Sequence, residues 1–265
     1  MGRNLQTMEK PIISLAPWFD TPAGRYVREW EQARLDELTA DIFGYNAVQI
    51  GLPCMDSLAA NRMPNKWQTD SALFTLQQSD ALQRVVLAHD FAELPFATQS
   101  LDLVVLPHVL EFANEPHQIL REVERVLIPE GQVIVCGFNP ISMWGVRQGV
   151  GRITGSHFLP LHGEFISVPR LKDWLKLLNM EVNRGHFGCY KPPFLTTKWL
   201  QRFAFLEKAG DRWWPYLGAL YMVQAIKRVK GMRLVGPALQ RSTKRMSAGV
   251  PATNRMRVQI EVESE

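Results

Sequence analysis

Polar and acidic side chains follow three apolar runs of the sequence, at the positions where strands would end. Asp90, His108 and Asn139 each come one or two residues after such a run, within residues 84–140. The runs are nearly continuous in apolar residues, which is typical of parallel strands buried on both faces. Ligands of parallel sheets bind beyond the carboxyl ends of the strands, where the strand order reverses. The spacing therefore predicts a ligand site near Asp90 and His108.

The segments that position these residues alternate between two periods. Strands are expected at 85–88, 101–106 and 132–138, and a helical period runs from 115 to 127. Asn114 is the predicted N-cap of this helix, Pro116 suits its first turn, and Pro129 with its neighbours ends it. Strand, strand, helix and strand in this order predict an α/β protein with a parallel sheet.

Four segments carry a family resemblance: 88–96, 100–105, 108–112 and 120–127. Together the segments resemble the second half of a class I S-adenosylmethionine-dependent methyltransferase domain of the type 11 group. Residues 137–142 are similar to a little-characterised proteobacterial branch of that group. The resemblance implies a Rossmann-like α/β fold, with a seven-stranded, mostly parallel sheet, helices on both faces and one reversed strand. It also implies S-adenosyl-L-methionine as the cofactor and methyl transfer as the reaction.

The same resemblance implies roles for residues at the strand ends. The Asp90 carboxylate would accept a hydrogen bond from the adenine amino group, and the amide of Phe91 would meet a ring nitrogen. Alternatively, Asp90 only caps the turn at Phe91. His108 would line the crevice, and its alternative is a packed histidine. Asp102 lies at the start of its strand, where a structural role is favoured.

The first strand, at 46–51, leads into a loop that departs from the family pattern. The family places an acidic residue two positions before the first glycine of a glycine-rich loop, which approaches the methionine and sugar of the cofactor. Here Gln49 takes the acidic position, Gly51 keeps the first glycine, and Pro53 and Met55 replace the later ones. Two outcomes stay open: an active enzyme that grips the cofactor differently, or a fold that has lost cofactor binding.

The second strand has two candidate positions. A strand at 66–69 places Asp70 at its tip, where the family carries an acid for the ribose hydroxyls. A strand at 72–76 offers no such acid, and Asp70 is then a surface aspartate.

Length and composition favour one core with additions. The chain has 265 residues, of which 46% are hydrophobic, and these values suit a single domain. We expect an N-terminal extension over 1–16, a methyltransferase-type domain over 17–230 and a basic, mostly disordered tail over 231–265. A helix is expected within 17–43, begun by Thr21 and Pro22. Later elements are expected at 169–180, 181–187, 197–208 and 218–227, and residues 140–165 are expected to cover the acceptor.

Cysteine usage and charge bear on the compartment and the partners. Cys54, Cys136 and Cys189 lack paired spacing, which favours a reducing cytoplasm and predicts neither a metal site nor a disulfide framework. No run of about 18 apolar residues is present, so no membrane span is expected. The basic tail is a solvated segment or a contact for nucleic acid or anionic lipid.

The expected partner is a small, partly apolar acceptor, and the oligomeric state stays open. Methyl transfer is an in-line displacement in which alignment supplies much of the rate, so no catalytic residue is assigned. His162 and Glu164 are possible proton acceptors, or ordinary loop residues. Two rival functions are a non-catalytic binding or regulatory protein, and an RNA methyltransferase guided by the basic tail.

Overall fold

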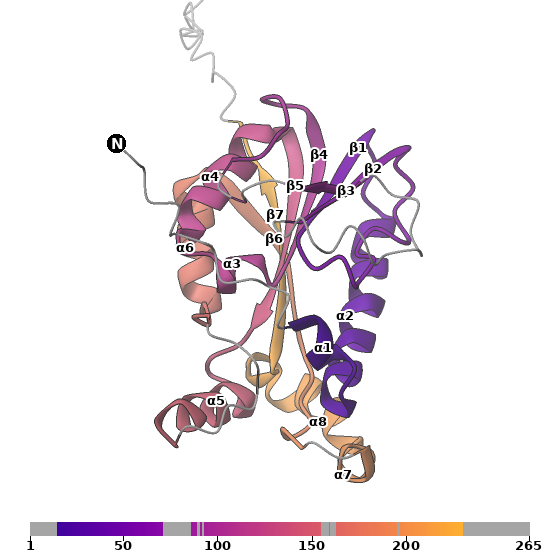
Figure 1. Ribbon diagram of the computed structural model, residues 1–265, viewed down its shortest axis with the longest axis vertical. Coiled ribbons are helices and arrows are strands. Elements are labelled where there is room, and N and C mark those ends of the chain that lie inside the picture. The colour runs from indigo at the N-terminus through magenta and orange to yellow at the C-terminus, as the bar shows by residue number, and fades with distance from the viewer. Residues whose placement is uncertain are drawn as a thin grey trace, which may run out of the picture. The chain divides into compact units, whose positions relative to one another are not determined.

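A seven-stranded mixed sheet forms the centre of the protein (Figure 1). The structure is a computed structural model, and it describes residues 15–70, 86–88, 91, 93–154, 159, 163–194 and 197–229. The chain divides into residues 1–229 and 230–265, and the second part, which contains the predicted tail, lies outside the described residues. The account below therefore concerns the first part alone.

The strands are arranged in the order β3-β2-β1-β4-β5-β7-β6. All neighbouring pairs are parallel except those made by β7, which runs antiparallel to both β5 and β6. The predicted Rossmann-like fold class with one reversed strand is thus confirmed. The strands are β1 (Asn46–Ile50), β2 (Asn65–Asp70), β3 (Val86–Ala88), β4 (Leu101–Pro107), β5 (Leu127–Phe138), β6 (Met180–Gly188) and β7 (Leu220–Lys227).

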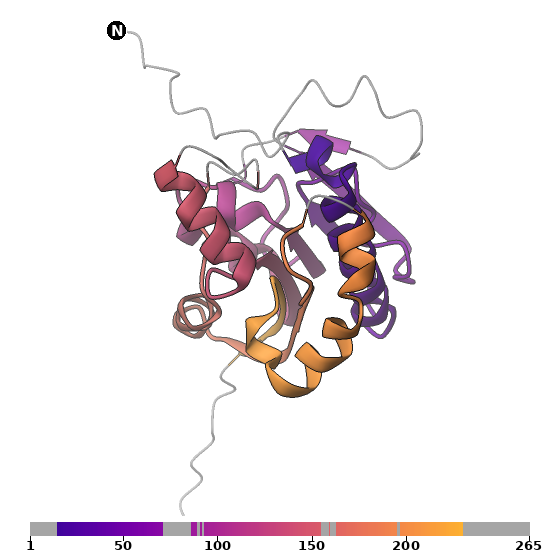
Figure 2. The same ribbon diagram turned by 90° about the horizontal axis from the view of Figure 1, so that it is seen from below.

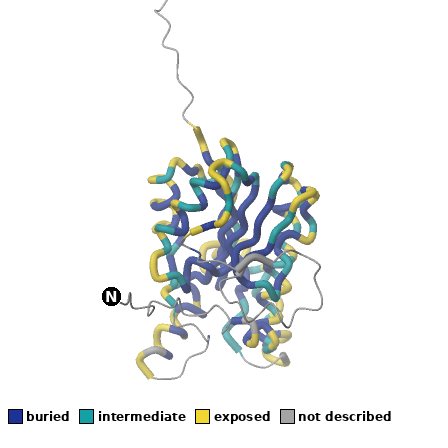
Figure 3. The backbone as a smooth tube through the Cα atoms, turned by 45° about the horizontal axis from the view of Figure 1, so that its top comes forward, coloured by how far each residue is buried: buried dark blue, intermediate teal, exposed yellow. Residues whose placement is uncertain are grey.

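Helices cover both faces of the sheet. Figure 1 shows α4 and α6 on one face and α2 on the other, and Figure 2 shows the same layers from below. The strands β1, β4 and β7 and the second half of β5 are largely buried, as Figure 3 shows for the centre of the sheet, whereas most of the edge strand β6 is at least partly exposed. The helices are α1 (Leu15–Phe19), α2 (Pro22–Ala40), α3 (Val109–Phe112), α4 (Pro116–Val126), α5 (Met143–Thr154), α6 (Val168–Leu177), α7 (Thr197–Arg202), α8 (Phe205–Trp213) and the 3-10 helix η3 (Pro215–Leu217).

Local chemistry fixes several of these elements. The Thr21 hydroxyl caps α2 by accepting from the Gly24 amide at 3.1 Å, and it donates to the Trp18 carbonyl at 2.7 Å. The Asp102 carboxylate accepts from the amides of Tyr45 and Asn46, at 3.0 and 2.9 Å, and so fixes the start of β1. The favoured structural role of Asp102 agrees with these two contacts.

A buried lysine joins the end of α4 to the end of β7. The ammonium of Lys227 donates to the carbonyls of Glu124 and Leu127, at 2.6 and 3.0 Å, and pairs with the Glu124 carboxylate at 3.0 Å. Glu124 lies in the last turn of the helix, where carbonyls lack intrahelical partners, and Leu127 is the C-cap. Lys227 therefore satisfies the helix end and fixes it against the last strand.

The structure differs from the sequence predictions in four places. Pro129 and its neighbours, predicted to end the helix, lie within β5, because α4 already ends at Val126 and the strand begins at Leu127. Asn114 does not cap α4: the N-cap is Glu115, which makes no side-chain cap hydrogen bond. The helix predicted at 197–208 is two helices, α7 and α8, separated at Phe203 and Ala204. Residues 143–154, expected to be a covering loop, form the helix α5. Its three glycines hid the helical period, because glycine is a poor helix former.

Replacing Asp102 tests how the start of β1 is held. We expect Asp102→Ala to lower the free energy of unfolding by about 2 kcal/mol, because two strand amides lose their charged acceptor. The matched control is Asp173→Ala, on the exposed face of α6, which should change stability by less than about 0.5 kcal/mol. Urea unfolding followed by circular dichroism measures both, and equal effects would contradict the assigned role.

Candidate functional site

The carboxyl ends of β1, β2 and β3 lie side by side at one edge of the sheet. Ile50 pairs with Thr69, and Asp70 pairs with Ala88. The second strand is therefore the first of the two predicted alternatives, and Asp70 is its last residue. Phe91 is buried, whereas Asp90 and residues 71–85 lie outside the described residues. The structure thus brings Gly51, Asp70 and the end of β3 to neighbouring positions.

The side chain of Gln49 is turned into the loop that follows β1. Its Nε2 lies 3.1 Å from the Gly51 carbonyl oxygen, 3.0 Å from that of Leu52 and 2.8 Å from that of Met55. Its Oε1 accepts from the Ser57 amide at 2.8 Å. Gln49 is buried, and its donor and acceptor atoms are all used within the protein. In this conformation it holds the loop in shape.

The loop itself folds back onto the core. Gly51 and Leu52 both have positive φ, 74° and 50°, so the chain turns sharply as it leaves the strand. The Gly51 amide donates to the Thr69 carbonyl at 2.7 Å. Leu52, Met55 and Leu58 are buried in the main core. Pro53 and Met55 replace glycines of the family pattern. Both are thus part of a packed turn whose carbonyl oxygens accept hydrogen bonds from the Gln49 side chain.

Gln49→Glu restores the family's acidic residue and tests this arrangement. We expect it to lower the free energy of unfolding by about 3 kcal/mol, because a buried carboxylate would face three carbonyl oxygens without a donor. Gln118→Glu, on a partly exposed position of α4, is the matched control and should be near neutral. Thermal and urea unfolding provide the comparison. A Gln49→Glu protein as stable as the wild type would contradict the role given to the amide.

His108 lies at the end of β4, between two carboxylates. Its Nε2 is 2.7 Å from the Glu31 Oε1 on α2, and its Nδ1 is 2.8 Å from the Glu111 Oε2 on α3. The second oxygen of Glu111 accepts from the Phe138 amide at 2.5 Å. All three side chains are buried. This group, the Glu31–His108–Glu111 cluster, makes His108 the packed histidine of the two predicted alternatives.

The carboxylates decide the charge of His108. Burial alone would lower its pKa, but the charge of Glu31 and the hydrogen bonds to Glu111 and Glu31 raise the pKa of His108 to about 10. Burial raises the pKa of Glu111 above its ordinary value, against the hydrogen bond from His108. We therefore expect His108 to be an imidazolium at neutral pH, shared between two carboxylates.

This charge state predicts how stability depends on pH. An ordinary histidine in the unfolded chain loses its proton near pH 6.5, whereas His108 keeps its proton to about pH 10 when folded. The stabilisation is complete below about 6.5 and declines by about 1.4 kcal/mol per pH unit as pH rises toward 10. In Glu31→Gln the pKa of folded His108 should be lower, because one anionic partner is lost. The decline in stability should therefore end at a lower pH.

The measurements are urea unfolding between pH 6 and 10, and NMR titration of histidine-labelled protein. The His108 ring resonances of the wild type should titrate above pH 8, and those of Glu31→Gln at a lower pH. Glu37→Gln, on the exposed face of the same helix, is the control. A His108 titration near pH 6.5 in the wild type would contradict the charged cluster.

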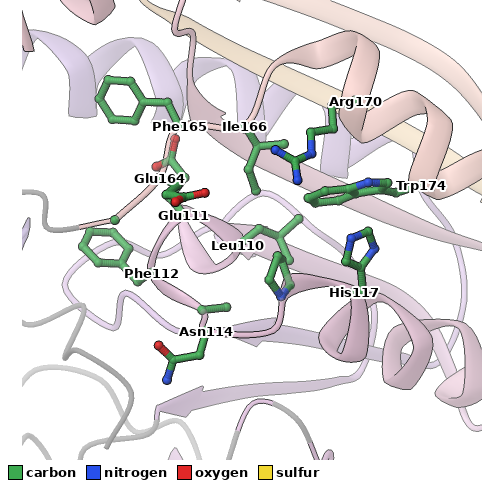
Figure 4. A pocket seen from close by; sticks show the side chains of 13 residues that line it. Leu110, Glu111, Phe112, Asn114, His117, Glu164, Phe165, Ile166, Arg170 and Trp174 are labelled. Atoms are coloured by element: carbon green, nitrogen blue, oxygen red, sulfur yellow. The ribbon is translucent and has the colours of Figure 1, made fainter. Parts of the chain in front are cut away.

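A pocket of about 400 Å³ opens beside this cluster (Figure 4). Glu111 belongs to both, so the pocket begins at the carboxyl end of β4. One wall comes from α3 and the start of α4, and the other from the chain before and within α6. The backbone of the second wall comes close to the first, since the Glu164 amide donates to the Glu111 carbonyl at 3.0 Å. The lining includes Leu110, Phe112, Asn114, His117, Glu164, Phe165, Ile166, Arg170 and Trp174.

The lining combines aromatic surface with a few polar groups. The ring of His117 lies 4.0 Å from that of Trp174, and the Arg170 guanidinium lies 5.0 Å from the Trp174 ring centre. Phe165 stacks on Phe138 with ring centres 5.7 Å apart. Sequence reasoning named Glu164 but missed His117, Arg170 and Trp174, which lie on the two helices. His162 lies outside the described residues. In the sequence these three residues look like ordinary positions of amphipathic helices, and nothing in their spacing indicates a pocket.

S-adenosylmethionine, the cofactor implied by the sequence resemblance, fits the described residues only in part. The ends of β1 and β2 are adjacent, and Asp70 is the last residue of β2, the position at which the resemblance implies an acid for the ribose hydroxyls. Gln49 and His108 do not offer free polar atoms to the methionine portion, because both are engaged within the protein. For the other four predicted residues, Gly51, Asp70, Asp90 and Phe91, contact with the cofactor stays a prediction.

Comparisons with known proteins agree with this geometry. Residues 66–135 match the family model described as a methyltransferase domain. The uncharacterized protein YafS of Escherichia coli K12 is 29% identical over 251 residues, which cover 93% of this chain and 96% of YafS.

Two solved structures share the fold. One belongs to the complex of the Haloferax volcanii Trm112 methyltransferase activator with a putative methyltransferase. It is 16% identical, with a TM-score of 0.58, and the match covers 84% of this chain and 99% of that one. The other is a S-adenosylmethionine-dependent methyltransferase of Thermotoga maritima, a possible histamine N-methyltransferase. It is 15% identical, with a TM-score of 0.59, over 82% and 96% of the two chains. Residues 66–135 thus match the methyltransferase domain family, and the chain has the class I S-adenosylmethionine-dependent methyltransferase fold.

Proposed function

We propose that the protein is a S-adenosylmethionine-dependent methyltransferase that acts on a small, partly apolar acceptor. The observation that carries the proposal is the shared sheet edge, at which Gly51, Asp70 and the end of β3 are neighbours. The match of residues 66–135 to the methyltransferase family supports it. When bound, the cofactor supplies an electrophilic methyl group on a sulfonium.

The chain's own residues divide into two groups in this proposal. Asp70, Asp90 and the Phe91 amide hold the adenosine, and the Gly51 turn lets the backbone come near the sugar. Gln49 and His108 are positioning residues: the first holds the loop after β1, and the second holds α2 over the end of β4. These positioning roles account for the hydrogen bonds that Gln49 and His108 make within the protein. In this proposal neither side chain contacts the cofactor.

The acceptor is assigned to the pocket that Glu111 shares with the buried cluster. A volume of about 400 Å³ suits a small molecule. Phe112, Phe165 and Trp174 supply apolar surface, and Arg170 and His117 supply polar contacts at its rim. Because transfer needs alignment more than a strong base, we assign these residues to binding rather than to proton transfer.

Isothermal calorimetry with S-adenosylhomocysteine tests the proposal without knowledge of the acceptor. We expect the wild type to bind and Asp90→Ala to bind at least about tenfold more weakly, because a charge-assisted hydrogen bond is lost. Glu93→Ala, three residues away and exposed, is the matched control and should bind like the wild type. Wild-type protein without heat of binding or thermal shift would overturn the proposal.

A second candidate function is a non-catalytic binding or regulatory protein with a methyltransferase fold. The observation that favours it is that the polar side-chain atoms of Gln49 and His108 all form hydrogen bonds within the protein. The calorimetry above separates the two functions, because only the enzyme requires a cofactor site. Mass spectrometry of the freshly purified protein adds an independent result, since a bound cofactor released on denaturation supports the enzyme.

A further inference from the structure

Apolar side chains point into solvent along α5. Trp144 and Gln148 face the body of the protein and are buried, whereas the opposite face of the helix is exposed. That face presents Met143, Val146, Val150 and Ile153, and Ile153 is 89% exposed. The spacing of three, four and three residues puts them on one stripe of the helix. An amphipathic helix packed on a core normally shows the reverse arrangement, with its polar face outward.

Aromatic side chains are exposed in the same way between β6 and β7. Trp213 is 70% exposed and Tyr216 73%, and Trp214, Leu217, Trp199 and Phe205 are also exposed. Trp199 stacks on Phe203, with ring centres 6.2 Å apart, and Arg202 lies 5.5 Å from the Trp199 ring centre. Large aromatic groups rarely gather on the surface of a soluble monomer without a partner.

The two groups form one surface, held by fixed contacts. A hollow of about 360 Å³ is lined by Ile141, Met143, Val146 and Arg147 on one side and by Leu217 on the other. The Asn139 side chain donates to the carbonyls of Tyr216 and Gly218, at 2.8 and 3.0 Å. The Trp144 indole donates to the Lys191 carbonyl at 2.7 Å. We call the exposed apolar side chains of residues 141–153 and 199–217 the docking surface.

The topology places the docking surface at the functional edge of the sheet. The helix α5 follows the carboxyl end of β5, and α7, α8 and η3 connect the carboxyl end of β6 to the start of the reversed β7. Figure 1 shows these helices together beyond one end of the sheet, and Figure 2, seen from below, shows α5 and the α7–α8 pair on either side of it. A ligand site at the strand ends thus opens toward this end of the protein.

The charge of this region is positive. Residues 141–154 and 191–217 contain seven Lys and Arg but only two acidic residues, Glu207 and Asp211. Glu207 is turned inward: it binds the Tyr26 hydroxyl and accepts from the amides of Cys189 and Tyr190. The two segments therefore carry an excess of five positive charges, and the guanidinium of Arg202 lies against the exposed ring of Trp199.

We propose that the docking surface binds the surface of an anionic phospholipid bilayer. Tryptophan and tyrosine favour the membrane–water interface, aliphatic side chains enter the acyl boundary, and lysine and arginine attract anionic headgroups. The surface is carried by α5 and by the helices between β6 and β7, at the same end of the sheet (Figure 1), so one extended partner can contact both groups. None of the helices in the described ranges is long and apolar enough to cross a membrane, so the contact is peripheral.

Cosedimentation with lipid vesicles tests this proposal. We expect the full chain to bind vesicles that contain phosphatidylglycerol, to bind phosphatidylcholine vesicles more weakly, and to dissociate as salt is added. The double variant Val146→Ser with Ile153→Ser should bind roughly tenfold more weakly, because two aliphatic side chains no longer enter the bilayer. Both positions are exposed, so the fold should be unaffected.

Leu177→Ser is the matched control. Leu177 is 80% exposed but ends α6, next to the start of β6 at the opposite end of the sheet, and its replacement should leave vesicle binding unchanged. The proposal is overturned by wild-type protein that stays in the supernatant, by equal binding to neutral vesicles, or by equal loss in the control. A dimer that the double variant dissociates, seen by light scattering, would assign this surface to a second copy instead. The cofactor calorimetry is done without lipid, so each proposal can fail alone.

Discussion

The Glu31–His108–Glu111 cluster holds the functional half of the molecule together. One imidazole joins the helix α2, the end of β4 and α3, and Glu111 extends the connection to β5 through the Phe138 amide. Removing three ionisable groups from water is costly, and mutual attraction with satisfied hydrogen bonds offsets that cost only when the geometry is fixed. The second oxygen of Glu31 has no hydrogen-bond partner within the described part of the chain, so the charge of His108 must offset the cost of burying this carboxylate. The position of α2 above the sheet, and of the pocket beside Glu111, follows from this arrangement.

The sequence predicted the sheet well because its strands are nearly continuous apolar runs, and buried parallel strands have that composition. It also offered Asp70 at the tip of the second strand as one of two alternatives, and β2 has that position. It did not reveal the partner of His108, since Glu31 is 77 residues away and looks like an ordinary charge on an amphipathic helix. Nor did it reveal α5, whose glycines and outward apolar stripe obscure both propensity and period.

Gln49 shows how a family pattern and a physical environment can lead to different interpretations of one residue. Compared with the family, it is an acid that has lost its charge. In the structure, its amide is the side chain that the turn needs, because it can donate to carbonyls and accept from an amide at once. A carboxylate accepts only, so the loop sequence and Gln49 suit each other. The loop after β1 is therefore a self-consistent turn, and cofactor recognition in our proposal relies on the neighbouring strand ends.

The reversed strand β7 constrains the order in which the chain acquires structure. It is the last strand in sequence, yet it lies between β5 and β6. During synthesis β6 therefore has no neighbour in the sheet until residues 220–227 have been made, and the exposed edge of β5 waits for the same segment. Pairings of this kind join late and distant parts of a chain, and such contacts slow folding and leave strand edges open to other chains. A nascent or truncated protein that ends before β7 would lack an entire side of its sheet.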